Sequence, residues 1–286
     1  MKTVEPYKTT LSSGNAYWMA RIAGAVYMKK SANDPFPDEK KILADLKKED
    51  PNFINVYGYS KNTAQAALVE HKDYFCFAFR GTDEIKDWLD NVNVFAEKAL
   101  FGEFHRGFWR SLNDVWQPLY KKYNELWESD MLQNKLQGGN LQIKKVRPIF
   151  ITGHSLGGAM ATIAVARLIH EDKPFISAYT FGQPRAMSVD TARIFNVEAK
   201  SRVFRFQNNN DIVTRIPARL MGYSHAGSFL YISDEQQLHN DPGFWYQFLD
   251  AIDGTVESFR DKKLDAIEDH GMAHYLDAIK KWDCTF

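Results

Sequence analysis

The sequence predicts an α/β fold in which a mostly parallel central sheet is flanked by helices. Short apolar runs typical of buried strands alternate along the chain with longer runs of helical periodicity. A Gly-x-Ser-x-Gly pattern at residues 153–157 stands between a strand-like run and a helix-like run. The 286 residues contain no internal repeat and no low-complexity tract, so we expect one domain over residues 1–286.

The amino-terminal half begins with two predicted helices. The first spans residues 12–30, and the second is a charged surface helix over residues 38–48. Apolar runs at residues 66–70 and 74–79 predict adjacent strands joined by a short turn. Bulky apolar side chains spaced along residues 106–126 predict a long helix.

The carboxyl-terminal half alternates strands and helices around the Gly-x-Ser-x-Gly pattern. Before the pattern, the polar residues 133–145 include two adjacent glycines and predict a loop. After it we expect a strand at 175–181, a helix at 186–196, a strand at 202–206, a strand or hairpin at 223–232, and a helix at 264–281.

Composition excludes several classes of protein. Lys plus Arg and Asp plus Glu both number 36, so no basic field favours nucleic acid as a partner. Two cysteines, Cys76 and Cys284, make neither a disulfide framework nor a metal site, and we expect no disulfide between them. No apolar stretch reaches the roughly 18 residues of a membrane span. The first residues lack the apolar core of a Sec signal, which leaves a cytoplasmic protein, export by another route, or a mature form.

Ser155 is the candidate nucleophile. A serine between a buried strand and a buried helix stands on a tight, strained turn that directs its hydroxyl out at the edge of the sheet. Gly153 and Gly157 leave room for the strand and the helix to approach each other. The amino terminus of the helix supplies backbone donors and partial positive charge for a developing oxyanion. The alternative is a chance match in an ordinary strand–turn–helix unit.

A serine nucleophile needs a base, and the base needs a carboxylate, in the chain order Ser, acid, His. Asp211 follows the predicted strand at 202–206 and is the candidate acid, although an aspartate that caps a turn is the alternative. The histidines that qualify as base by chain order are His225, His239, His270 and His274. His270 lies at a helix break, where its ring can point into a cleft, whereas we expect His274 to pack on a helix. The spacing of these two histidines suits a metal, but no third ligand accompanies them, so we expect no metal.

Two backbone donors are expected to stabilise the oxyanion. One is the N–H of Leu156, the residue after the nucleophile. Thr82, just after the strand at 74–79, offers both an N–H and a hydroxyl as the second, although a simple strand-ending turn explains this segment equally well.

The residues that follow Thr82 predict a short amphipathic helix. Its apolar face consists of Ile85, Trp88, Leu89 and Val92. This helix is either an ordinary surface helix or a movable lid, at roughly residues 83–96, that covers the site in water and meets lipid when it opens.

Taken together, several segments resemble the class 3 lipases, the family of the filamentous-fungal triacylglycerol lipases. They occur in the order of the family over roughly residues 65–280: Phe79-Arg80-Gly81-Thr82, Phe104-His105-Arg106-Gly107-Phe108, Thr152-Gly153-His154-Ser155-Leu156-Gly157-Gly158-Ala159, Thr180-Phe181-Gly182-Gln183-Pro184-Arg185, Asn208-Asn209-Asn210-Asp211-Ile212-Val213, Tyr223-Ser224-His225-Ala226-Gly227 and Asp269-His270-Gly271-Met272 with Tyr275. One departure is residues 186–188, where the family often has Val-Gly-Asn.

The resemblance implies an α/β-hydrolase fold and ester hydrolysis without a cofactor. It implies Ser155 as nucleophile, Asp211 as acid and Thr82 as an oxyanion donor through both its backbone and its side chain. It selects His270 as the base, because the base of the family follows an Asp and precedes a Tyr, and it makes His225 structural.

The hypothesis is therefore a serine carboxylic-ester hydrolase, most simply a lipase that cleaves acylglycerol esters through an acyl-enzyme intermediate. Its partners would be a lipid or other ester substrate and the lipid–water interface. Phospholipase A1 or feruloyl esterase activity fits the same machinery. An alternative from another class is a catalytically silent, lipase-like interaction module. The sequence predicts no oligomeric state.

Overall fold

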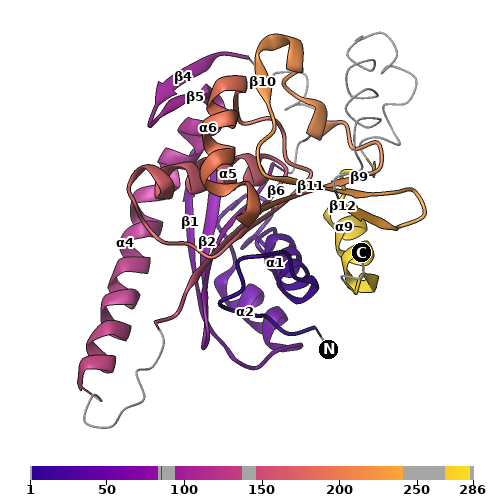
Figure 1. Cartoon of the computed structure of the whole chain (residues 1–286). Helices are drawn as coiled ribbons and strands as arrows, with labels where there is room; N and C mark the ends of the chain where they lie inside the picture. Colours follow the sequence, from indigo (N-terminus) through magenta and orange to yellow (C-terminus); the bar gives the residue numbers. More distant parts are fainter. Residues whose placement is uncertain (1, 83–84, 86–93, 137–145, 241–267, 284–286) are drawn as a thin grey trace.

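A long mixed sheet forms the centre of the molecule (Figure 1). The computed structural model describes residues 2–82, 85, 94–136, 146–240 and 268–283. In these residues the strands of the central sheet are β1 (Phe53–Lys61), β2 (Ala64–His71), β3 (Phe75–Phe79), β6 (Ile149–His154), β7 (Ala178–Phe181), β9 (Val203–Asn208), β11 (Ser228–Ile232) and β12 (Leu238–Asn240). Their spatial order is β1-β2-β3-β6-β7-β9-β11-β12. The strands from β3 to β11 pair in parallel, and antiparallel strands complete both edges.

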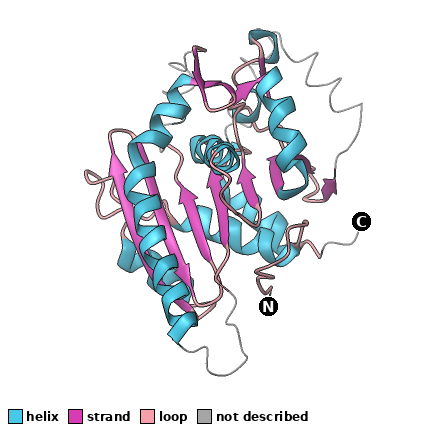
Figure 2. Ribbon diagram, turned by 60° about the vertical axis from the view of Figure 1, so that its left-hand side comes forward, coloured by secondary structure: helices cyan, strands magenta, loops and turns pink. Residues whose placement is uncertain are grey.

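Helices cover both faces of this sheet, as Figures 1 and 2 show. One apolar core lies under α1 (Ser13–Ala25), α2 (Glu39–Lys47) and α9 (Met272–Lys281). A second core on the opposite face lies under α4 (Arg106–Leu136), α5 (Leu156–His170) and α6 (Val189–Ala199). The prediction of a mostly parallel sheet flanked by helices is therefore confirmed.

Strand β3 illustrates why these sequences form central strands. Phe75, Phe77 and Phe79 point into the core under α4 and α5, whereas Cys76 and Ala78 point into the core under α1. All five side chains are fully buried, because a parallel strand in the middle of a two-sided sheet has no solvent-facing surface. The near-continuous apolar run is the sequence signature of this environment.

A small second sheet was not predicted. It contains β4 (Ala96–Ala99), β5 (Gly102–His105), β8 (Met187–Ser188) and β10 (Tyr223–Ser224), in the order β10-β8-β5-β4. It lies at the top of Figure 1, above the central sheet. Strands of two to four residues are too short to show an alternating pattern, and their pairing joins segments distant in sequence.

Other differences concern the ends of elements. Helix α1 ends at Ala25, before the expected end at residue 30. Helix α4 continues to Leu136, beyond the predicted helix and into the expected loop at 133–145. Strand β1 was missed because its burial pattern mixes exposed and buried positions without regular alternation.

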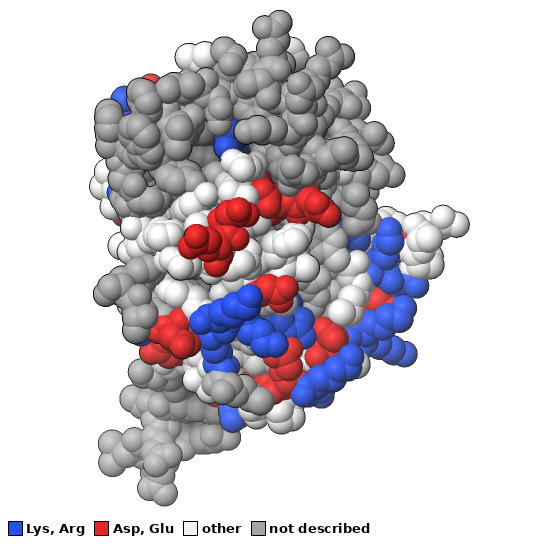
Figure 3. Space-filling view, turned by 90° about the vertical axis from the view of Figure 1, so that its right-hand side faces the viewer, with Lys and Arg blue, Asp and Glu red and all other residues white. Residues whose placement is uncertain are grey.

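On the face seen in Figure 3, Lys and Arg side chains lie among Asp and Glu side chains rather than forming a field of one sign.

Candidate active site

Ser155 stands on the turn between β6 and α5 in a strained backbone conformation, with φ 59° and ψ −132°. A residue with a side chain rarely adopts positive φ, and such strain is concentrated at functional sites. The packing around this turn is tight. A Cβ atom on Gly153 would lie 2.2 Å from the Gly157 carbonyl oxygen, and one on Gly157 would lie 2.1 Å from the Phe79 carbonyl oxygen. Both glycines are therefore needed for the close approach, as the sequence predicted.

Two other predicted residues, Asp211 and His270, meet near this turn. Asp211 follows β9, His270 precedes α9, and both side chains are fully buried. The His270 Nδ1 atom lies 2.8 and 2.9 Å from the two carboxylate oxygens of Asp211. Gly182, at the end of β7, packs against both. A Cβ atom on Gly182 would lie 2.7 Å from His270 Cε1 and 2.8 Å from Asp211 Oδ2.

The environment of Asp211 keeps its carboxyl group ionised. Burial alone would raise the pKa of Asp211, but the charge and hydrogen bond of His270 and the hydrogen bond of Tyr275 hold this pKa below its ordinary value. The Tyr275 hydroxyl donates to Oδ2, and the Val213 N–H donates to Oδ1 at 2.9 Å. The same Tyr275 oxygen accepts the Asn208 N–H at 2.9 Å. The position of Tyr275 belongs to the sequence motif, but its contact with the acid was not predicted.

The contact with Asp211 fixes the tautomer of His270. An ionised carboxylate only accepts hydrogen bonds, so Nδ1 carries the proton, and Nε2 of a neutral ring carries a lone pair. Among the described residues, the buried His270 Nε2 and Ser155 Oγ atoms have no hydrogen-bond partner. Two buried polar atoms without partners are costly in a folded protein, and here they are the two atoms that a proton-transfer reaction would use.

His154 contacts both the ring and the backbone of His270. Its ring is stacked on that of His270, with centroids 4.5 Å apart and an interplanar angle of 29°. Nε2 of His154 donates to the His270 carbonyl oxygen at 2.7 Å, so its Nδ1 accepts from the Tyr27 hydroxyl, also at 2.7 Å. Burial, followed by the proximity of His270, lowers the pKa of His154 to about 3. His154 is therefore a neutral residue with a structural hydrogen-bond role. The part played by Tyr27 was not predicted.

The two candidate oxyanion donors lie on the segments that border the nucleophile. Leu156 is the first residue of α5 and directly follows Ser155. Thr82 follows Gly81, and Gly81 lies close to the nucleophile. A Cβ atom on Gly81 would lie 2.7 Å from Ser155 Cβ. The Gly81 N–H donates to the Tyr27 hydroxyl oxygen at 3.2 Å, which fixes the backbone before Thr82.

Most of the predicted lid lies outside the described residues. This applies to Trp88, Leu89 and Val92, whereas Ile85 is helical and half-buried. At the end of the predicted lid, Val94 and Phe95 are 41% and 58% exposed, so this part of the segment presents apolar surface. The Arg106 guanidinium lies 4.5 Å from the centre of the Phe95 ring.

The structure distinguishes the four candidate histidines. The Nε2 atom of His225 donates to the Thr214 carbonyl oxygen at 2.7 Å, and burial holds the pKa of this ring well below its ordinary value. His239 lies in β12 and His274 lies on α9, and both are exposed. Of the four, His270 is the one whose ring contacts Asp211.

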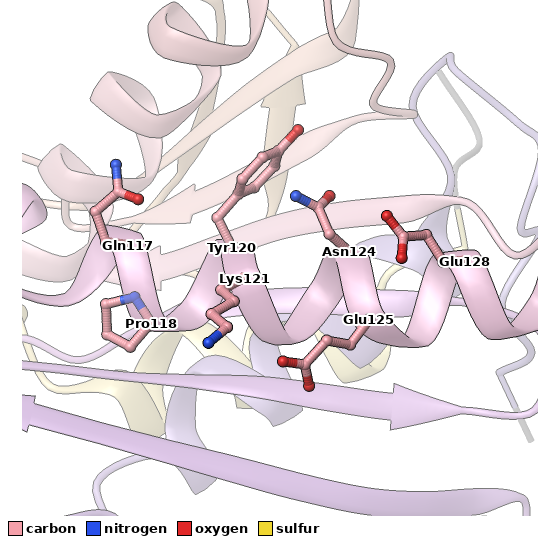
Figure 4. A pocket seen from close by; sticks show the side chains of 7 residues that line it. All are labelled: Gln117, Pro118, Tyr120, Lys121, Asn124, Glu125 and Glu128. Atoms are coloured by element: carbon pink, nitrogen blue, oxygen red, sulfur yellow. The ribbon is translucent and has the colours of Figure 1, made fainter.

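A separate hollow runs along the outer surface of α4 (Figure 4). Its lining comes from successive turns of this one helix: Gln117, Pro118, Tyr120, Lys121, Asn124, Glu125 and Glu128. None of these residues belongs to the site around Ser155, and the hollow is unrelated to it.

In the described part of the chain, no group of three or more His, Cys, Asp or Glu side chains could hold a metal ion. Over the same residues, no helix combines the length and the apolar character needed to cross a membrane.

Comparison with known families gives the context of this site. The model of the family "Lipase (class 3)" matches residues 76–221, which is just over half of the chain. The chain belongs to the class 3 lipase family. The matched segment contains Ser155, Asp211 and Thr82, and it ends before His270.

Relatives similar in sequence include a phospholipase and a mono- and diacylglycerol lipase. The chain is 27% identical to phospholipase A1-II 1 of Oryza sativa, over 71% of this chain and 56% of that protein. It is 28% identical to the secreted mono- and diacylglycerol lipase A of Penicillium cyclopium, over 68% of this chain and 59% of that protein. The chain thus spans between half and two thirds of the length of these relatives.

Solved structures identify the fold of this chain as the α/β-hydrolase fold. One neighbour is a triacylglycerol lipase whose catalytic centre is formed by a serine protease triad. It is 25% identical, with a TM-score of 0.52, over 80% of this chain and 78% of that chain.

Proposed function

We propose that this protein is a serine carboxylic-ester hydrolase, and more specifically a lipase that cleaves acylglycerol esters through an acyl-enzyme intermediate. The observation that carries the proposal is the buried Asp211–His270 pair beside the strained turn of Ser155. A hydroxyl, an imidazole with its lone pair on Nε2 and an ionised carboxylate are the groups that acyl transfer requires. Membership of the class 3 lipase family supports the same chemistry.

In the proposed mechanism, the Ser155 Oγ attacks the ester carbonyl while His270 Nε2 takes its proton. Asp211 holds the ring and stabilises the imidazolium that forms. The N–H groups of Thr82 and Leu156 stabilise the tetrahedral oxyanion, assisted by the Thr82 hydroxyl. Collapse of the intermediate releases the alcohol, which receives the proton from His270. Water then attacks the acyl-enzyme by the same route and regenerates Ser155.

The proposed substrates are acylglycerols presented at a lipid–water interface. What supports this choice is the apolar face predicted for residues 83–96, together with the exposed side chains of Val94 and Phe95 at the end of this segment. We propose that this segment is a lid on a single domain over residues 1–286. A lid of this kind predicts a rate that rises when a glyceride passes from monomer to emulsion. An unchanged rate would remove the interfacial lid from the proposal. A panel of triacylglycerol, diacylglycerol, phospholipid and feruloyl esters would identify the preferred ester.

Covalent labelling of the full chain with a fluorophosphonate tests the nucleophile directly. We expect one adduct, located by mass spectrometry on the peptide that contains Ser155, and no adduct in a Ser155→Ala variant. Ser177, equally buried but remote from the strained turn, is a matched control, so Ser177→Ala should label as the wild type does. A folded wild-type protein that neither labels nor hydrolyses esters would instead indicate a catalytically silent interaction module.

A further inference from the structure

The run of three asparagines before Asp211 has a specific set of contacts that the proposed mechanism does not use. The Asn208 Nδ2 donates to the Asp269 carbonyl oxygen at 2.9 Å. The Asn209 Nδ2 and the backbone N–H of Asn210 both donate to the Asp269 Oδ2, each at 3.2 Å. Three consecutive residues next to the acid therefore hold the single residue that precedes the base, His270.

These contacts join two loops that are distant in sequence. Asp211 and His270 are separated by 59 positions, and their hydrogen bond requires the two loops to keep a fixed spacing. The loop that carries His270, here called the base loop, is also held at a point other than Asp269, because the His270 carbonyl oxygen accepts from His154 Nε2. Removing the side-chain attachment at Asp269 would leave the backbone contacts in place but free the loop to shift by a fraction of an ångström. A shift of about 1 Å at a catalytic group can cost about 10²-fold in rate.

We propose that Asp269 is a positioning residue, whose carboxylate holds the His270 loop against the Asn209 side-chain amide and the Asn210 N–H so that the base stays aligned with Asp211. This inference rests on the proposed function, in which His270 is the base. Asp269 does not contact the reacting atoms. It acts through the placement of its neighbour.

The surroundings of Asp269 oppose its ionised form. Burial, with Asp211 and Asp234 adding to it, raises the pKa of the Asp269 carboxyl, against the opposing effects of the Asn210 N–H and His274. The hydrogen bonds from Asn209 and Asn210 therefore hold the carboxylate at a place that burial and the neighbouring carboxylates disfavour.

The test compares acceptor-free and acceptor-bearing variants in the full-length protein. Asp269→Ala and Asp269→Leu remove the acceptor, and Asp269→Asn keeps a neutral one. With a soluble p-nitrophenyl ester, we expect the first two to lower kcat about tenfold with KM nearly unchanged, and Asn to restore kcat to within about threefold of the wild type. The control is Asp234→Asn, because the exposed Asp234 also accepts from Asn209, at 3.4 Å, but does not touch the base loop. Its kcat should equal that of the wild type.

The outcomes separate this inference from the proposed function. A folded Asp269→Ala or Asp269→Leu variant with the kcat of the wild type would overturn the inference. A loss in Asp234→Asn as large as that in Asp269→Ala would also overturn it, because the effect would then belong to Asn209 or to local charge. A wild-type protein that is inactive on esters and unlabelled by fluorophosphonate would instead refute the proposed function itself.

Discussion

The ring of His154 lies against the ring of His270, with centroids 4.5 Å apart, while its Nε2 atom holds the His270 backbone carbonyl at 2.7 Å. The residue beside the candidate nucleophile is thus also the support of the candidate base. Any displacement of the Ser155 turn would be transmitted to His270. The turn between β6 and α5 thus carries both the candidate nucleophile and a residue that holds the loop of the candidate base.

The same support extends to the candidate oxyanion segment. Tyr27 donates from its hydroxyl to His154 Nδ1 and accepts at the same oxygen from the Gly81 N–H. Gly81 precedes Thr82, so one tyrosine just beyond α1 connects the predicted oxyanion donor to the base. A preorganised arrangement of this kind costs little reorganisation when charge develops in a transition state.

The identity of the base can be tested by comparing two histidines four residues apart. We expect His270→Ala to lower ester turnover roughly 10³-fold, because proton transfer from the nucleophile loses its acceptor. His274 is exposed on α9, so His274→Ala should retain nearly full activity. Initial rates on a p-nitrophenyl ester measure both. An inactive His274→Ala beside an active His270→Ala would show that the base has been misassigned.

Gly182 provides a steric test of the Asp211–His270 pair. Its φ is +57°, and a methyl group there would lie within 2.8 Å of atoms of both side chains. Gly182→Ala should therefore push the pair apart and lower kcat by about 10²-fold. The measurement is kcat on a soluble ester, with circular dichroism to verify folding.

Gly222 supplies the matched control for this prediction. Its φ is +84°, but a methyl group would meet nothing within 4 Å. Gly222→Ala thus incurs the backbone strain alone, about 1–2 kcal/mol of stability, and should keep its activity. Equal losses of activity in the two variants would mean that strain, and not contact with the pair, explains the effect at Gly182.

Much of the fold could be predicted because its signals are local. The apolar run before Ser155 and the small apolar residues after it became β6 and α5, and the near-continuous apolar run at residues 74–79 became β3. Strand β1 was missed because partly exposed strands lack a continuous apolar run, and α4 was predicted too short because its last turns carry few apolar residues.

The candidate site was predicted less completely, because its contacts join distant segments. Chain order left four histidines open as the base. The helix break favoured His270 over His274, and the resemblance to a family selected His270. No pattern in the sequence indicates that Tyr27 lies 2.7 Å from His154. Packing of α1 against β6 creates that contact, and it becomes visible only in three dimensions.

Thr82 can be tested as an oxyanion donor by separating its hydroxyl from its backbone. Thr82→Val keeps the shape but removes the hydroxyl, and we expect kcat to fall about 10²-fold, in the range found when one oxyanion donor is lost. Thr82→Ser keeps the hydroxyl and should remain within a few-fold of the wild type. The two variants are compared by kcat on one soluble ester. Full activity in Thr82→Val would leave the backbone N–H as the only contribution of this residue.

The buried His154 predicts how stability depends on pH. Its pKa falls from an ordinary 6.5 in the unfolded chain to about 3 in the folded protein. The unfolded state therefore binds one more proton between these values. The contribution of the neutral His154 to the stability of the folded state is complete above pH 6.5 and is lost as the pH falls toward 3. We expect the free energy of unfolding, measured with urea, to fall by up to about 1.4 kcal/mol per pH unit from this group alone.

A His154→Gln variant isolates this contribution. Glutamine can still donate to the His270 carbonyl and accept from Tyr27, but it does not titrate. The variant should therefore show a shallower loss of stability between about pH 6.5 and pH 4.5. The residual slope reflects other buried histidines, such as His225, whose pKa is also lowered. Identical slopes in the two proteins would mean that His154 titrates alike in the folded and unfolded states, in conflict with its neutral role beneath His270.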